Sequence, residues 1–167
     1  MNDQKKIIET AIRYRGSVIN DVAWLEKLID NFIIFHFTKE ETKIIEMQLL
    51  LFGDNRLIFE NKRQIFDYIA MKHHYDWYLG YETIREGLPK SKSIAMNKDL
   101  VWVIEERNKF THLLLDSTEA GRNKVDTIGF LKFKNSPEVF EYKETQFKEL
   151  MFVIYNLSNY IGKKIGM

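Results

Sequence analysis

The sequence has no cysteine, only two prolines and almost no net charge. Without cysteine it forms no disulfide and has no thiolate nucleophile or Cys-ligated metal centre. Because 25 Lys and Arg nearly balance 24 Asp and Glu, no overall field attracts a polyanion, and any nucleic-acid site must be local. Apolar runs such as "FIIF" and "LLLF" are too short to cross a bilayer, and the charged start lacks a signal-peptide core. We therefore expect a cytoplasmic protein without a membrane partner, forming a single domain over residues 1–167.

Apolar residues recur every three or four positions over long stretches, which predicts a mainly helical protein. The first stretch keeps its phase across Gly16 and ends near Phe37, so one long helix is expected there. The residues expected on its buried stripe are Ile8, Ala11, Ile12, Ile19, Val22, Leu25, Ile29, Phe32 and Ile33.

Further helices are expected after this one. The segment "TKEE" predicts the start of the second helix, with Thr38 as the capping residue and Glu41 reaching back to it. Others are expected at about residues 61–77, 98–115 and 145–165. Residues 127–143 alternate apolar and polar positions around a turn, which predicts a β-hairpin. The expected fold class is therefore all-α, a bundle of four to five main helices with a small β-hairpin before the last helix.

The octapeptide "EERNKFTH", residues 105–112, interrupts the apolar pattern of its helix with Arg107. The residues that share this stripe are Leu100, Val103, Ile104, Arg107, Phe110, Thr111 and Leu114. An arginine stays charged, so on a buried stripe it must be paired or bind an anion. Asn108 and His112 lie one above the other on a neighbouring strip. Because a long arginine side chain can reach that strip, Arg107, Asn108 and His112 can converge on one small ligand.

This set of side chains suits cleavage of an RNA phosphodiester by the neighbouring 2′-hydroxyl. Histidine, with an unperturbed pKa of about 6.5, can accept or deliver a proton near neutrality. The planar guanidinium of Arg107 can stabilise charge on the phosphoryl oxygens. A second proton carrier is missing from the octapeptide. A two-fold dimer that packs this helix against its copy would supply a second Arg107 and His112.

The segment "RNKFTH" resembles the Arg-polar-x-x-x-His motif of the HEPN superfamily (higher eukaryotes and prokaryotes nucleotide-binding domains). The motif's place late in a helix, before a short hairpin and a closing helix, is similar to that family. The segments "VAWLEKLIDNFI" and "LIFENKRQIFDYI" also resemble the helices that precede the motif in prokaryotic stand-alone HEPN proteins. The resemblance spans most of the chain, and its most specific part is these three motif residues.

The resemblance implies a homodimeric, metal-independent endoribonuclease without a cofactor, which leaves 2′,3′-cyclic phosphate ends. Arg107 and His112 would be catalytic, with Asn108 beside them and Glu26 and Thr111 in supporting roles. Many members act as toxins or in abortive infection and other defence systems. An antitoxin partner is then expected, such as a nucleotidyltransferase-like protein. Other members are catalytically silent and bind a protein partner or a nucleotide, and this alternative stays open.

A purely structural alternative for Arg107 is an ion pair with Glu26 on the first helix. The histidines of "KHHYDWY", His73 and His74, point about 100° apart on a helix, so a metal site there is not expected. The aromatic residues Tyr75, Trp77, Tyr78 and Tyr81 could stack on RNA bases, although packing is the favoured role.

Several lysines form local basic patches that could follow an RNA backbone. The candidate RNA-binding lysines are Lys90, Lys92, Lys132 and Lys134. Further basic residues lie in "GRNKVD" and "GKKIG", and a solvated surface explains all of these positions equally well. The sequence contains no Gly-rich phosphate loop and no serine nucleophile elbow, so enzyme classes built on those motifs have no support.

Overall fold

The computed structural model describes residues 2–53, 57–85, 95–116, 118, 127–134 and 136–167. It is mostly helical, with a small three-stranded antiparallel sheet before the last helix. The elements are, in order, α1 (Asn2–Phe37), α2 (Glu41–Met47), the π-helical turn η1 (Gln48–Phe52), α3 (Phe59–His73), α4 (Tyr75–Leu79), α5 (Ala95–His112), β1 (Leu114–Leu115), β2 (Thr127–Lys134), β3 (Ser136–Lys143) and α7 (Glu144–Ile165).

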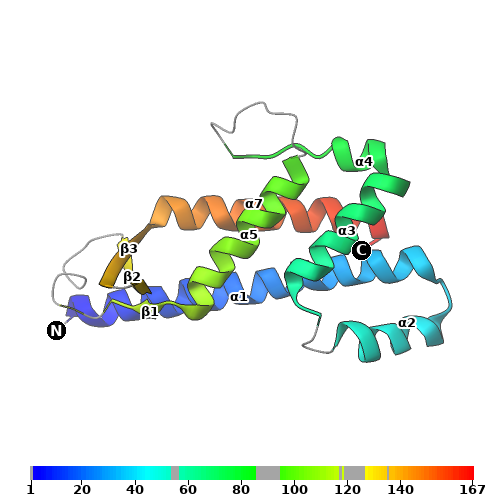
Figure 1. Cartoon of the computed structure of the whole chain (residues 1–167). Helices are drawn as coiled ribbons and strands as arrows, with labels where there is room; N and C mark the ends of the chain where they lie inside the picture. Colours follow the sequence, from blue (N-terminus) through cyan, green and yellow to red (C-terminus); the bar gives the residue numbers. More distant parts are fainter. Residues whose placement is uncertain (1, 54–56, 86–94, 117, 119–126, 135) are drawn as a thin grey trace.

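Helices α1 and α7 run side by side in the same direction, and α5 crosses them obliquely (Figure 1). Near the start of both helices, Tyr14 of α1 stacks on Phe147 of α7, with ring centroids 3.7 Å apart. Leucine, isoleucine and aromatic side chains from α1, α3, α5, α7 and the sheet join in one hydrophobic core. The prediction of one long first helix that continues through Gly16 is confirmed.

The buried stripe of α1 differs from the prediction at its N-terminal end. Residues from Val22 onward are buried as expected, but nearer the start the core side chains are Ala11, Tyr14 and Val18. Ile12 is 65% exposed, and Ile8 and Ile19 are also exposed. An arginine-rich segment with apolar residues on two adjacent faces does not specify which face is buried, and the packing of Tyr14 against α7 decides it.

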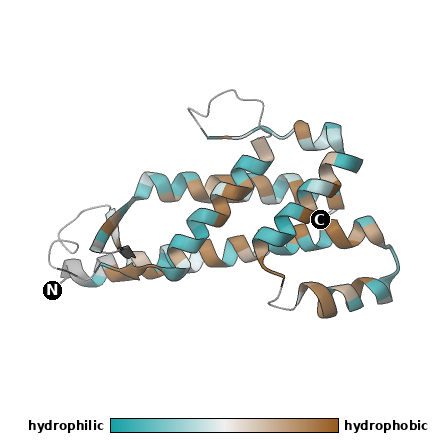
Figure 2. Cartoon of the chain, viewed as in Figure 1, coloured by the Kyte–Doolittle hydropathy of each residue, from teal (hydrophilic) through white to brown (hydrophobic). Residues whose placement is uncertain are grey.

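Helix α2 and the turn η1 form an arm beside the bundle that contributes no buried residue (Figures 1 and 2). The predicted Thr38–Glu41 capping pair is wrong, because α2 begins at Glu41 and its N-cap is Glu40. Thr38 instead accepts a hydrogen bond at its Oγ1 from the backbone N–H of Glu40 (3.1 Å). The hydroxyl oxygen of Thr38 is thus used in this short turn, before the helix begins, and does not cap α2.

The predicted hairpin is present as β2 and β3, and a short strand β1 pairs antiparallel with β2. Helix α5 therefore ends at His112, not at Leu115 as predicted. Leu114 and Leu115 are opposite Leu131 and Phe130, and these ladder contacts replace further helical turns. Within the described residues, no helix is both long enough and apolar enough to span a membrane.

Candidate functional site

The octapeptide residues occupy the last two turns of α5, where the helix leaves the bundle. Arg107 is half-buried, whereas Asn108, Thr111 and His112 are exposed. Arg107 donates a hydrogen bond from Nη1 to Oδ1 of Asn108 (3.2 Å). The hydroxyl of Thr111 donates to the backbone carbonyl of Arg107 (2.5 Å), as a threonine inside a helix often does. Two of the predicted site residues, Asn108 and Thr111, thus contact Arg107 directly.

The expectation that the stripe of Arg107 is buried along its whole length is wrong. Leu100 and Val103 are fully buried, but Leu114 is 71% exposed. Arg107 is half-buried and Thr111 is exposed, although Phe110 between them is fully buried. Phe110 packs against Phe130 and Tyr142 of the sheet, whereas the side of the stripe that bears Arg107 and Thr111 is partly open to solvent. Arg107 can therefore meet an external ligand.

The ion pair with Glu26, the structural alternative for Arg107, does not form. Glu26 pairs instead with Lys62 of α3, with Oε1 2.7 Å from Nζ. Among the residues that the structure describes, no carboxylate forms an ion pair with Arg107. A half-buried guanidinium whose charge is not balanced within these residues is suited to an anionic ligand.

Glu106 and Lys109, which flank Arg107 and Asn108 in the helix, face residues of the sheet. Glu106 is 5% exposed and its Oε1 lies 2.5 Å from Nζ of Lys109, which also lies over the ring of Phe140 of β3. The pKa of Tyr142 is raised, mainly by burial and secondly by the negative charge of Glu106, so its phenol stays protonated. The burial of Glu106 could not be predicted from the sequence, because this residue falls outside the apolar stripe.

Helix α1 reaches the end of α5 through Arg15. Its Nη2 donates a hydrogen bond to the backbone carbonyl of Leu113 (2.6 Å), which directly follows His112. Ile12 and Ile19 are three residues before and four residues after Arg15, so they lie on the same face of α1. The exposed Ile12 and Ile19 therefore lie on the face of α1 from which Arg15 reaches Leu113, and the exposed Leu114 is the next residue along the chain.

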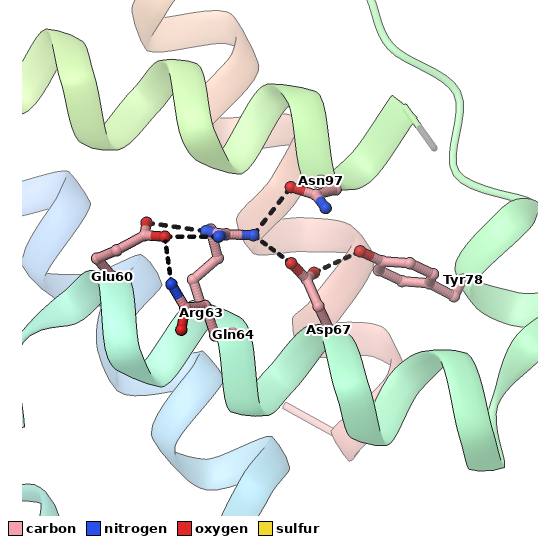
Figure 3. Close-up of polar contacts among 6 residues, drawn as sticks. All are labelled: Glu60, Arg63, Gln64, Asp67, Tyr78 and Asn97. Atoms are coloured by element: carbon pink, nitrogen blue, oxygen red, sulfur yellow. Dashed lines mark hydrogen bonds and ion pairs between the residues drawn. The ribbon is translucent and has the colours of Figure 1, made fainter. Parts of the chain in front are cut away.

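A buried network of charged residues holds the first turn of α5 against α3 and α4 (Figure 3). Arg63 donates to both carboxylate oxygens of Glu60 (2.9 and 2.6 Å), to Asp67, and to the side-chain oxygen of Asn97 (2.9 Å). Asp67 also accepts a hydrogen bond from the hydroxyl of Tyr78. Burial raises the pKa of Asp67 in spite of these donors. Since Asn97 belongs to α5, the network sets where this helix begins.

A second buried carboxylate, Asp99, fixes the same end of α5. It accepts hydrogen bonds from the hydroxyl of Tyr81 (2.9 Å) and from Nε of Arg85 (2.7 Å), and it is fully buried. The guanidinium of Arg85 lies 4.5 Å from the ring centroid of Trp102, which shields the pair. Periodicity could not reveal these acidic residues, because their partners come from other segments.

Of the four candidate RNA-binding lysines, Lys132 is exposed. The side chain of Lys134, together with Lys90, Lys92 and the segment "GRNKVD", lies outside the described residues. Within the described part of the chain, no group of three or more His, Asp or Glu side chains is placed to hold a metal ion.

The aromatic residues Trp77, Tyr78 and Tyr81 pack as predicted and do not form an open stacking surface. Tyr78 and Tyr81 are buried, and Trp77 stacks on Phe32 and Tyr160 with ring centroids 5.4 Å apart in both pairs. Only Tyr75 of the four is exposed.

Comparisons with known proteins matched no family model, no curated protein and no solved structure. The site therefore has to be interpreted from its own chemistry. At the end of α5 it combines one exposed histidine, an amide and one arginine that no carboxylate of the described residues pairs with, and such side chains can bind a phosphate and exchange a proton.

Proposed function

We propose that this chain is a metal-independent endoribonuclease with a HEPN-like helical fold, which acts as a two-fold dimer. The observation that carries the proposal is the environment of Arg107. Its guanidinium is half-buried, bonded to Asn108, and not paired with any carboxylate of the described residues. Lys62 and Arg63, the buried cations of the described chain, both have carboxylate partners. An arginine in this state suits a phosphodiester.

The dimer follows from what the reaction needs and from the surface around α5. His112 can remove the proton of the RNA 2′-hydroxyl while the 2′-oxygen attacks the phosphorus atom. The bond from phosphorus to the 5′-oxygen then breaks, and that oxygen needs a proton, which the partner's His112 can supply. Arg107 stabilises the charge on the non-bridging oxygens. The exposed Ile12, Ile19 and Leu114 provide apolar surface that a second copy would bury.

A toxin or defence role is the biological setting that the resemblance favours, with an antitoxin partner such as a nucleotidyltransferase-like protein. The alternative is a catalytically silent module that binds a protein or nucleotide. The same exposed apolar residues would also suit the binding of a partner protein without any reaction, and this favours the alternative.

A cleavage assay separates the two proposals. The wild-type protein is incubated with total cellular RNA in excess chelator, beside His112→Ala, Arg107→Ala and the control His73→Ala, which alters an exposed histidine at the far end of α3. We expect discrete cuts with cyclic phosphate ends from the wild type and the control, and a loss of at least 100-fold in both site variants. If the folded wild-type dimer leaves all RNA intact, the silent module is the correct function.

A further inference from the structure

We infer that Arg15 of α1 is a positioning residue for His112, an inference that rests on the proposed ribonuclease function. His112 is the last residue of α5, and two residues later the chain is already in strand β1. The orientation of the imidazole therefore depends on how firmly this junction from helix to strand is held. Because the imidazole is exposed, packing around it contributes little.

Two of the contacts that hold the junction are local to the motif. The N–H of Leu113 donates to the carbonyl of Lys109 (3.0 Å), and the hydroxyl of Thr111 donates to the carbonyl of Arg107 (2.5 Å). Both move with α5 and cannot fix it relative to the bundle. On the other side, the N–H of Asp116 donates to the carbonyl of Gly129 (2.8 Å), which fixes only the strand.

The contact from Arg15 is different, because it comes from another helix and from 98 residues away in the sequence. It satisfies the carbonyl of Leu113, just beyond the end of α5, where helix carbonyls lack intrahelical partners. A cation at a helix C-terminus also interacts favourably with the helix dipole. Charge-assisted hydrogen bonds are shorter and stronger than neutral ones, and this one measures 2.6 Å.

The geometry therefore links the core of the bundle to the proposed acid–base group. Arg15 lies one residue from Tyr14, which is buried and stacked on α7, so its backbone is well anchored. The path runs from this anchored turn of α1 through the guanidinium to Leu113 and His112. A displacement of about 1 Å at a reacting group can reduce a rate by about 100-fold. Loss of this hydrogen bond should therefore lower turnover more than it weakens RNA binding.

The test compares Arg15→Met, which keeps the side-chain length, with Arg15→Lys, which can still donate to the carbonyl of Leu113. Lys5→Met is the control, because it removes one positive charge from the same helix at a side chain that is 79% exposed. Three quantities are measured on folded dimers: hydrogen exchange of peptides covering residues 109–116, and kcat and KM for the cleaved RNA.

We expect Arg15→Met to exchange at least tenfold faster over residues 109–116 and to lose about tenfold to 100-fold in kcat, with KM changed little. Arg15→Lys should restore most of both, and Lys5→Met should match the wild type. Unchanged exchange in Arg15→Met would overturn the inference. A raised KM with normal kcat would also overturn it, because Arg15 would then bind RNA directly. If the wild type cuts no RNA, the ribonuclease proposal fails, and the exchange data alone decide whether Arg15 holds the junction.

Discussion

Replacing Asp30 with asparagine is expected to stabilise the protein at neutral pH. Asp30 of α1 is 6% exposed and accepts a hydrogen bond at Oδ2 from Nζ of Lys62 (3.0 Å). Its other oxygen, Oδ1, is buried without a hydrogen-bond partner among the described residues. Lys62 also contacts Glu26 (2.7 Å) and the backbone carbonyl of Phe52 (3.3 Å), so it keeps acceptors in the variant.

The magnitude follows from the pKa of the Asp30 carboxyl. Burial raises this pKa from 3.8 to about 6, more than the hydrogen bond and charge of Lys62 lower it. Between about pH 4 and pH 6 the native state therefore binds a proton that the unfolded chain does not, and stability falls as pH rises through this range. A difference of about two pKa units corresponds to about 3 kcal/mol. Above pH 6 the native state bears this full cost.

Urea denaturation at several pH values between 4.5 and 7.5 measures the effect. The free energy of unfolding of Asp30→Asn should exceed that of the wild type by about 1 kcal/mol at pH 4.5 and by about 2–3 kcal/mol at pH 7. Asp21→Asn makes the same chemical change at a more exposed position of α1 and should differ by less than about 0.5 kcal/mol at any pH. An Asp30→Asn protein that is less stable than the wild type at pH 7 would refute the reasoning, because the pairing with Lys62 would then outweigh the cost of burial.

Five further substitutions test the packing and the proposed dimer. Arg63→Met should lower the free energy of unfolding by about 3–5 kcal/mol in thermal or urea denaturation, since Asp67 would lose a buried partner; a loss below 1 kcal/mol would mean that the network contributes little. Gly129→Ala should cost about 1–3 kcal/mol, because the new Cβ would lie 2.8 Å from Cβ of Asp116. Gly16→Ala, with nothing within 4 Å, should instead stabilise α1 by about 0.5–1 kcal/mol. Ile12→Asp should dissociate the dimer in light scattering, whereas Leu49→Asp on the exposed arm should not; equal effects would place the dimer surface elsewhere.

Local periodicity was sufficient to predict most of the helices but not the end of α5. A helix needs only contacts three and four residues apart, so α1, α3 and α7 are visible in the sequence. The run Leu113 to Leu115 fits a helix and a strand equally well, and only pairing with β2 favours the strand. The hairpin itself was predicted because its alternation is local, whereas β1 depends on a partner that follows later in the chain.

Buried charge is the part of the site that the sequence could not reveal. Lys62 and Asp30 are 32 residues apart, and Asp99 meets Tyr81 and Arg85 from a separate segment. Nothing in the spacing of charged residues distinguishes such pairs from solvated ones. Arg107 was found because it falls on an apolar stripe of its own helix, which is a local signal. Glu106, its deeply buried neighbour, gave no such signal.

The two ends of α5 are held in the same way, by charged residues of other segments. At its start, Asn97 and Asp99 are bound by Arg63 and Arg85, and beyond its end the carbonyl of Leu113 is bound by Arg15. Between these two contacts no other element has to pack over Arg107, since the position of the helix does not depend on packing at that residue. A helix that is held at both ends can leave one position of its apolar stripe open to a ligand without unfolding. This arrangement explains how an arginine on an apolar stripe can be tolerated, and why that arginine is the best candidate for binding a phosphate.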